Sequence, residues 1–243
     1  MDLEAISYEV SGRPYTGFLA GGSAGAPAPG ILVIHEAGGL TDHVKGKAAA
    51  LAELGYVAFA MDLFGAELET PTPDRPETLA AAQAVVRRLR DDVGAFRARV
   101  TAGLKILQDD ERVDTSRLAA IGYCLGGAAA IELARTGAPL AVVAGFHAGV
   151  LPGTAEDDRA IRARILLCHG AGDPVVPASE IQDFTARLSE AGIDWQLHLY
   201  GGVGHSFTNR EIDAWNFPGF AYDARADSSA WAALLHLLGE AFA

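Results

Sequence analysis

Apolar residues gather in short runs that are separated by helical patterns along most of this chain. An alternating apolar and polar pattern over residues 6–10 and 15–19, with Ser-Gly-Arg-Pro between them, predicts an opening hairpin. Later runs of mostly apolar residues, rich in β-branched side chains, predict buried strands. These predicted strands cover residues 30–35, 56–61, 117–122, 140–145, 165–169 and 195–200.

Helical periodicity fills most of the intervals between these strands. The pattern predicts helices at 43–54, 125–135, 178–191 and 229–242, and two helices within 77–107 that are broken near 91–94. Apolar strands joined through helices by short connections indicate an α/β fold, with a mainly parallel sheet and helices on both faces. The chain has 243 residues. At roughly 150 residues per domain, this length corresponds to between one and two domains. We expect a single domain over residues 1–243.

The charge balance excludes two classes of partner. The chain has 19 lysines and arginines against 31 aspartates and glutamates, a net charge of −12 with histidine neutral. Nucleic acid phosphates and anionic membrane surfaces both bind concentrated positive charge, so we expect neither as a partner. The N-terminal segment has acidic residues where a signal peptide has a basic start, and no apolar run is long enough to span a bilayer.

The cysteine content agrees with a reducing compartment. The two cysteines, Cys124 and Cys168, lie in unlike contexts and are interpreted as separate thiols rather than a disulfide. We therefore expect a cytoplasmic protein.

Chemistry in such a sheet is expected beyond the carboxyl ends of the strands. The predicted strand 117–122 ends at the first glycine of Gly-Tyr-Cys124-Leu-Gly-Gly, which has the form Gly-x-nucleophile-x-Gly. Small flanking residues allow a sharp strand-to-helix turn, and the free N–H groups at the helix start favour a thiolate and an adjacent oxyanion. The alternative is a glycine-rich turn with a buried cysteine. The strand–turn–helix context favours a catalytic Cys124.

Two more strand ends carry candidate partners for this cysteine. Asp173 lies in Gly-Ala-Gly-Asp-Pro after strand 165–169, and His205 lies in Gly-Gly-Val-Gly-His after strand 195–200. Taken alone, Asp173 is more typical of a turn residue and His205 of a structural histidine. The order nucleophile, acid, histidine is however that of α/β-hydrolases, and it predicts a triad.

A fourth strand end is less decisive. Ile-His-Glu36-Ala37-Gly-Gly follows strand 30–35, at the place where α/β-hydrolases supply a second oxyanion N–H. A carboxylate at this position either handles the proton of the cysteine or anchors the loop, and the spacing does not decide between these roles.

These motifs together resemble the dienelactone hydrolase family, the carboxymethylenebutenolidases, over about residues 8–238. The resemblance implies an α/β-hydrolase fold and a triad of Cys124, His205 and Asp173. It implies that Glu36 contacts the resting thiol and is displaced when substrate binds. It also implies an oxyanion hole formed by the backbone N–H groups of Leu125 and Ala37.

The implied reaction is hydrolysis of a small ester or lactone through a thioacyl intermediate on Cys124. No metal or organic cofactor is expected, since the histidines form no His-x-x-x-His pair. The expected partner is a small-molecule substrate, and the expected assembly is a monomer or a small homo-oligomer.

The chain departs from the family where substrate is held. Well-known members bind a substrate carboxylate with arginines, one of them shortly after the catalytic histidine. Asn209 stands where that arginine is expected here, and Arg210 is one position further on. The arginines at 75, 87 and 88 are interpreted as solvated helix surface. The sequence therefore leaves open whether the substrate is anionic.

Several aromatic side chains lie close to these strand ends in the sequence. We expect Tyr123 and His147 to contact substrate. The others are interpreted as packing residues; they are Phe64, Phe146, Phe207, Trp215 and Phe217.

Two alternative functions remain open from the sequence. One is another enzyme on the same fold, such as a thioesterase, a peptidase or an acyltransferase. The other is a non-catalytic protein that binds a ligand or senses oxidants through Cys124.

Overall fold

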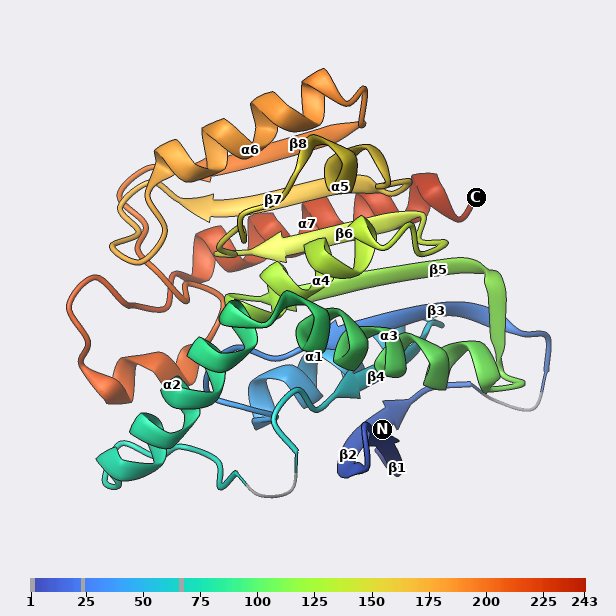
Figure 1. Ribbon diagram of the computed structural model, residues 1–243, viewed down its shortest axis with the longest axis horizontal. Coiled ribbons are helices and arrows are strands. Elements are labelled where there is room, and N and C mark those ends of the chain that lie inside the picture. The colour runs from blue at the N-terminus through green and yellow to red at the C-terminus, as the bar shows by residue number, and fades with distance from the viewer. Residues whose placement is uncertain (1–2, 23–24, 66–67) are drawn as a thin grey trace. The chain divides into compact units, whose positions relative to one another are not determined.

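The computed structural model describes residues 3–22, 25–65 and 68–243 (Figure 1). The chain divides into two compact units, one that ends at Ala120 and one that begins at Ile121. The single domain expected over residues 1–243 stays a prediction.

The first unit contains the predicted hairpin. Strands β1 (Glu4–Val10) and β2 (Arg13–Ala20) pair antiparallel, from Glu4 opposite Leu19 to Val10 opposite Arg13. The two turn residues, Ser11 and Gly12, both have positive φ, of 51° and 77°. Two residues with positive φ form the tight turn whose twist matches that of the strands.

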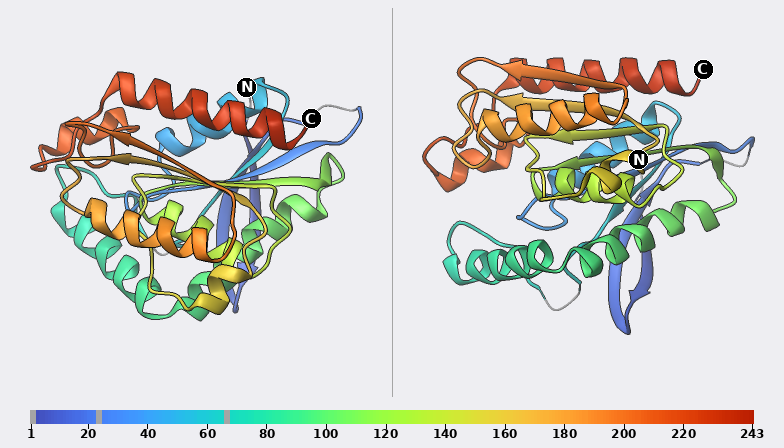
Figure 2. Two further views of the ribbon diagram at one scale, coloured as in Figure 1. Left: turned by 90° about the horizontal axis from the view of Figure 1, so that it is seen from above. Right: turned by 45° about the horizontal axis from the view of Figure 1, so that its top comes forward.

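The rest of the first unit alternates strand and helix. Strands β3 (Ala28–Ile34) and β4 (Val57–Met61) are parallel, and β4 also pairs antiparallel with β2. Helices α1 (Asp42–Glu53) and α3 (Val93–Asp109) lie on opposite faces of these strands (Figure 2). Helix α2 (Pro76–Asp91) precedes α3, and the predicted break between them is confirmed. At the break, Asp92 caps α3 by accepting a hydrogen bond from the N–H of Ala95.

Strand β5 (Val113–Tyr123) begins in the first unit and ends in the second. The second unit continues with the parallel strands β6 (Val142–Phe146), β7 (Arg164–Gly170) and β8 (Trp195–Tyr200). Helices α4 (Leu125–Arg135) and α6 (Ala178–Glu190) cover one face of them, and α7 (Ala224–Ala241) covers the other (Figure 2). The predicted α/β architecture, with parallel strands and helices on both faces, is confirmed.

Two short elements were not predicted. Helix α5 (Ala155–Arg159) has five residues and the 3₁₀ helix η1 (Arg210–Trp215) has six. Neither is long enough to show a helical repeat of apolar positions.

Helix α4 and strand β6 are buried along their whole length. Every residue of α4 is buried, as is every residue of β6. The helix therefore has no exposed polar face, and its two charged residues, Glu132 and Arg135, are buried as well.

Two glycines allow close packing at the start of α4, Gly122 against α4 itself and Gly127 against the segment after β6. A Cβ placed on Gly122 would lie 2.0 Å from the carbonyl oxygen of Gly126, and one placed on Gly127 would lie 2.4 Å from the Cβ of Ala148. Both distances are far below van der Waals contact, so no side chain fits at either position without displacing backbone.

The far end of α4 is held by buried charges. The Arg135 side chain is fully buried, with ion-pair distances of 2.6 Å to Glu132 and 2.8 Å to Asp158. Arg187 pairs with the other oxygen of Asp158 at 2.8 Å, and the ring of Phe184 lies 5.5 Å from each guanidinium. Two positive and two negative groups balance, so α4, α5 and α6 are joined without an unpaired buried charge.

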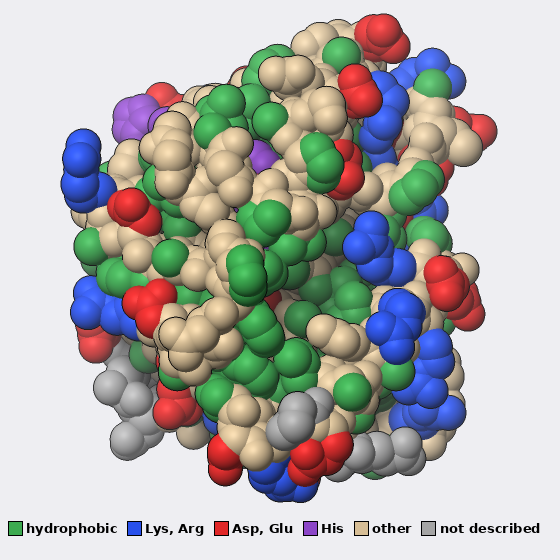
Figure 3. Space-filling view, turned by 90° about the vertical axis from the view of Figure 1, so that its left-hand side faces the viewer, with side chains coloured by type: hydrophobic (Ala, Val, Ile, Leu, Met, Phe, Trp, Pro, Cys, Tyr) green, Lys and Arg blue, Asp and Glu red, His purple; other side chains and the backbone are tan. Residues whose placement is uncertain are grey.

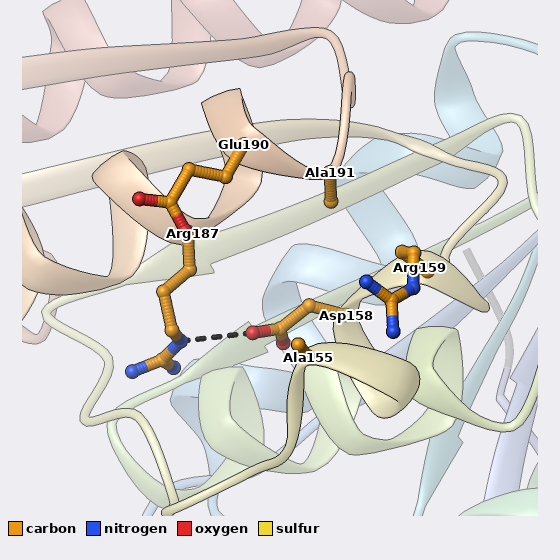
Figure 4. A pocket seen from close by; sticks show the side chains of 6 residues that line it. All are labelled: Ala155, Asp158, Arg159, Arg187, Glu190 and Ala191. Atoms are coloured by element: carbon orange, nitrogen blue, oxygen red, sulfur yellow. Dashed lines mark hydrogen bonds and ion pairs between the residues drawn. The ribbon is translucent and has the colours of Figure 1, made fainter.

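A small hollow of about 70 Å³ lies beside this cluster, between α5 and the end of α6. Figure 4 shows Arg187 reaching Asp158 at its edge. None of its lining residues belongs to the predicted site; they are Ala155, Asp158, Arg159, Arg187, Glu190 and Ala191.

In the part of the chain that the structure describes, no helix is both long and apolar enough to cross a membrane. Among the same residues, no three His, Cys, Asp or Glu side chains are grouped so that they could hold a metal ion.

The strand–helix crossing gives a stability prediction. Gly122→Ala is expected to lower the free energy of unfolding by about 3 kcal/mol or more, because the new methyl group overlaps backbone that has no room to move. Gly239→Ala is the matched control. Gly239 lies in α7 with open space around it, so its replacement is expected to raise stability by about 0.5–1 kcal/mol. Urea unfolding of both variants measures the difference, and equal stability of the two would contradict the close crossing.

Candidate active site

Three segments of the second unit meet at the carboxyl ends of their strands. Cys124 follows β5, Asp173 follows β7 and His205 follows β8. His205 Nδ1 lies 2.6 Å from Asp173 Oδ2, and His205 Nε2 lies 3.1 Å from Cys124 Sγ. The structure therefore places the three predicted residues in one hydrogen-bonded line.

Cys124 stands at the turn between β5 and α4 in a strained conformation. Its φ of 50° and ψ of −112° are rarely adopted by a residue with a side chain. Its N–H donates to the carbonyl of Phe146 at 2.9 Å, and its own carbonyl accepts from Gly127 and Ala128. The turn leaves the thiol partly exposed. It also places the N–H of Leu125 in the first turn of α4, where backbone donors have no partner within the helix.

The loop after β7 holds the Asp173 carboxylate from both sides. Oδ1 accepts hydrogen bonds from the N–H groups of Val175 and Val176, at 2.7 and 2.9 Å, and Oδ2 faces His205. Burial favours the protonated acid, but the hydrogen bond to His205 and the two backbone donors outweigh it. The pKa of Asp173 is therefore lowered, and the group is a carboxylate.

A second histidine supports this loop. His169, at the end of β7, is 1% exposed, and its Nε2 lies 3.0 Å from the carbonyl oxygen of Val176. Burial lowers the pKa of His169, so the ring is neutral and Nε2–H donates to that carbonyl. The same Val176 donates its N–H to Asp173, so His169 fixes the segment that orients the carboxylate.

His205 is enclosed between two other rings. His147 and Phe220 meet it edge to face, with centroid distances of 5.1 and 4.9 Å. Burial favours the neutral imidazole, but the electrostatic interaction with Cys124 and the hydrogen bond to Asp173 raise the pKa of His205 to about 10. At neutral pH the ring is therefore an imidazolium, and its Nε2 faces the Cys124 sulfur.

Backbone strain is concentrated around this line of residues. The described residues include five positions with positive φ that are not glycine, and Cys124, His147 and Ser206 are three of them. Ser206 follows His205 directly, and His147 follows β6 and contacts the His205 ring. Such strain persists only where the surroundings determine the conformation, and it is most often found at functional sites.

The two aromatic residues expected to contact substrate are buried beside the triad. Tyr123 is fully buried and stacks on Phe146 at 4.9 Å. His147 is fully buried too, and its Nε2 lies 2.9 Å from the hydroxyl of Thr208.

Asn209 stands where the family resemblance places a carboxylate-binding arginine, and Arg210 is the next residue. Both side chains make contacts within their own loop. Asn209 is buried, and its side-chain oxygen accepts the N–H of Glu211 at the start of η1. Arg210 is exposed, and its guanidinium lies 4.8 Å from the ring centroid of Tyr222.

Glu36 and Ala37 lie in the first unit, just after β3; Glu36 is buried and Ala37 is partly exposed. Glu36 Oε1 lies 3.3 Å from Nδ1 of His43, at the start of α1. His43 was not predicted as a site residue. A histidine in the first turn of a predicted helix has no sequence feature that indicates contact with Glu36. The turn is held by His35, whose Nδ1–H donates to the carbonyl of Glu36 while its Nε2 accepts from Leu63 N–H.

The model of the "Dienelactone hydrolase family" matches residues 16–242. This chain belongs to the dienelactone hydrolase family. It is 27% identical to the carboxymethylenebutenolidase of Pseudomonas putida, over 85% of this chain and 86% of that protein. It is 26% identical to a probable 2-oxo-3-(5-oxofuran-2-ylidene)propanoate lactonase of Bradyrhizobium sp, over 94% of this chain and 90% of that one.

A solved structure agrees over nearly the whole chain. The dienelactone hydrolase-like promiscuous phosphotriesterase from metagenomic libraries is 35% identical, covers 98% of each chain and has a TM-score of 0.91. The expected α/β-hydrolase fold is thereby confirmed. Membership in the family makes this chain a hydrolase of esters or lactones.

The two cysteines of this hydrolase predict selective alkylation. Cys168 is 1% exposed and burial raises its pKa to about 12, whereas Cys124 is partly exposed. Only an exposed, ionised thiol reacts readily. Iodoacetamide is expected to add one group per folded chain, none to Cys124→Ala and one to Cys168→Ala, as counted by mass spectrometry. Modification of the folded Cys124→Ala variant at the wild-type rate would contradict the assignment.

The ion pair at His205 predicts a shifted titration. The sulfur of Cys124 raises the pKa of the ring, so Cys124→Ala is expected to lower that pKa from about 10 by about 1–3 pH units. Proton NMR of the His205 ring across pH 5–11 measures both values. Cys168→Ala is the control and should leave the titration unchanged. An equal pKa in wild type and Cys124→Ala would show that the sulfur carries no charge beside the ring.

Proposed function

We propose that this protein hydrolyses a small ester or lactone through Cys124, His205 and Asp173, with a thioacyl enzyme as intermediate. The observation that carries the proposal is the continuous line from Asp173 Oδ2 through the His205 ring to Cys124 Sγ, with contacts of 2.6 and 3.1 Å. This line supports the proposal, because acyl transfer needs a nucleophile, a proton carrier and an orienting carboxylate within hydrogen-bond reach of one another.

In the first step the Cys124 sulfur attacks the carbonyl carbon of the substrate. A C–S bond forms and the carbonyl π electrons move to oxygen, which becomes an oxyanion. The donor proposed for this oxyanion in the second unit is the N–H of Leu125, in the first turn of α4. The second proposed donor, implied by the family resemblance, is the N–H of Ala37. Loss of one such donor typically costs about 10²–10³ in rate.

In the second step the oxyanion collapses and the C–O bond to the leaving group breaks. His205 carries its proton on Nε2, facing the sulfur, and gives it to the departing oxygen. The product of an ester is a free alcohol, and that of a lactone is a hydroxyl group still attached to the acyl chain. The enzyme is left acylated on sulfur, with a neutral imidazole.

In the third step the neutral His205 ring takes a proton from water. The resulting hydroxide adds to the thioester carbon, and collapse of this intermediate breaks the C–S bond. The acid leaves, and the sulfur and the imidazolium are restored. Asp173 holds Nδ1–H throughout, which keeps Nε2 directed at the reacting atoms and stabilises the charged ring.

Glu36 is proposed to act before the first step. The family resemblance implies that it contacts the resting thiol and is displaced by substrate. Glu36 Oε1 lies 3.3 Å from His43 Nδ1, so the carboxylate has a polar neighbour within its own unit. Tyr123 and His147 are proposed to form the wall of the substrate site beside the triad. The enzyme is further proposed to act in the cytoplasm, as a monomer or a small homo-oligomer.

Phosphotriester hydrolysis is a second candidate activity. It is favoured by the 35% identity to the promiscuous phosphotriesterase over 98% of both chains. The same sulfur and the same oxyanion donors would act on phosphorus in place of carbon.

A substrate panel tests the proposed function. Wild type is expected to hydrolyse at least one of dienelactone, a neutral lactone, an activated acetate ester and an aryl phosphotriester. Cys124→Ala is expected to lose about 10⁴-fold or more in kcat, because the nucleophile is gone. Cys168→Ala is the matched control and should retain the wild-type rate, since its sulfur is buried. All assays contain reductant.

Three results of the panel are informative. Turnover that depends on Cys124 supports the proposal, and the ranking of substrates shows whether a negative charge is favoured. Equal rates in wild type and Cys124→Ala would exclude Cys124 as nucleophile. Absence of turnover, with a sulfenic acid formed on Cys124 by peroxide, would favour the sensing alternative.

A further inference from the structure

The loop between β8 and α7 carries three aromatic side chains in contact with one another and with His205. Trp215 stacks on Phe217 at 5.4 Å, Phe217 meets Phe220 edge to face at 5.6 Å, and Phe220 meets the His205 ring at 4.9 Å. We call Trp215, Phe217 and Phe220 the aromatic strip. The loop is the orange-red segment that projects at the left of Figure 1, beyond the carboxyl ends of β6, β7 and β8.

The strip is partly exposed, unlike Phe207 in the same loop. Phe207 is fully buried and packs on His147 and Tyr200, so it belongs to the core. All three residues of the strip keep part of their surface exposed. Figure 3 views the protein from this end and shows hydrophobic side chains gathered on the surface there. Packing accounts for Phe207 but leaves the exposed rings of the strip unexplained.

The loop holds the strip in a defined place. The N–H of His205 donates to the carbonyl of Gly219 at 2.9 Å, and the N–H of Phe220 donates to the carbonyl of Phe217 at 3.1 Å. Gly219 has a φ of 78°, and a Cβ there would lie 2.6 Å from the ring of Pro174, next to Asp173. The strip is therefore positioned by the same backbone that positions the triad.

We propose that the aromatic strip binds a flat apolar group, such as a phenyl ring, on the leaving-group side of the substrate; this rests on the proposed ester hydrolysis. The side follows from His205. The ring that is proposed to protonate the leaving oxygen is the ring that Phe220 contacts, so the inner end of the strip lies against that catalytic group. Partly exposed rings in offset and edge-to-face contact offer a flat surface to another ring.

The charges around the strip favour a neutral group. Glu211 and Asp213 are exposed on η1 between His205 and Trp215, and both repel an anion. Arg210 is held over the ring of Tyr222, and the Asn209 side chain is used to cap η1. The strip is therefore matched to an uncharged aromatic alcohol rather than to a carboxylate.

Benzyl acetate and propyl acetate separate ring binding from chemical reactivity, because their leaving alcohols are of similar basicity. Phe217→Ala and Trp215→Ala are expected to lower kcat/KM about tenfold for benzyl acetate and less than about twofold for propyl acetate. Trp195→Ala is the matched control. Trp195 is partly exposed at the amino end of β8, and its ring N–H donates a hydrogen bond to the Ser189 hydroxyl. Its replacement should not change the ratio of kcat/KM for benzyl acetate to kcat/KM for propyl acetate.

The acyl side is tested with ethyl phenylacetate against ethyl butanoate. Phe217→Ala should change this ratio less than it changes the ratio for the benzyl ester. A larger change on the acyl side would overturn the placement at the leaving group, and unchanged ratios for both pairs would overturn the strip as a binding surface.

A binding measurement that needs no turnover tests the aromatic strip, even if the wild-type enzyme does not hydrolyse these esters. In the Cys124→Ala background, benzyl acetate is expected to change the tryptophan fluorescence, and addition of Phe217→Ala should raise its dissociation constant about tenfold. Propyl acetate should show no such difference. Equal binding of benzyl acetate with and without Phe217 would overturn the strip, whereas loss of turnover alone would overturn only the proposed hydrolysis.

Discussion

The contact between β5 and α4 at Gly122 is the constraint on which the site depends. A strand and a helix pass so closely there that the space for a Cβ is taken by the backbone of Gly126 and Gly127. The chain turns within one residue, and that residue, Cys124, takes a positive φ. The same turn raises the sulfur out of the core and directs the start of α4 toward it. The exposure of the Cys124 sulfur, the strain of its backbone and the position of the N–H donors at the start of α4 therefore have the same steric cause.

Strain at one residue has to be balanced by order around it. The N–H and the carbonyl of Cys124 are both hydrogen-bonded, the first to Phe146 and the second to α4. The other end of α4 is fixed by Arg135, whose buried guanidinium joins Glu132 and Asp158. A helix held at both ends leaves the turn no means of relaxing, which is the condition under which strained backbone persists.

Electrostatics at the triad depends on burial and pairing together. His205 is almost fully buried, which by itself favours a neutral ring, yet its pKa is raised to about 10. The causes are the two neighbours of the ring, the Cys124 sulfur at Nε2 and the Asp173 carboxylate at Nδ1. Each partner is positioned by backbone, Cys124 by the turn and Asp173 by the N–H groups of Val175 and Val176. The charge on the ring therefore follows from loop geometry as much as from residue type.

The loop after His205 shows how neighbouring aromatic residues divide between roles. Phe207 enters the core, whereas the rings from 215 to 220 remain partly exposed and lead outward from His205. Packing was the common interpretation of Phe207, Trp215 and Phe217 from sequence, because an aromatic residue in a loop has no periodicity that reveals its surroundings. Exposure and ring geometry are properties of the folded loop.

The sequence by itself determined the alternation of strands and helices, since buried strands and amphipathic helices leave repeats that local chemistry enforces. It determined the break near Asp92 and the bounds of α4, and the order of Cys124, Asp173 and His205 beyond their strands. Tertiary structure decided what depends on distance between remote segments. The line from Asp173 to Cys124, the support of Val176 by His169 and the pairing of Glu36 with His43 each join residues that no local pattern links. Local patterns arise from neighbours along the chain, whereas charge, strain and exposure at a site arise from neighbours in space.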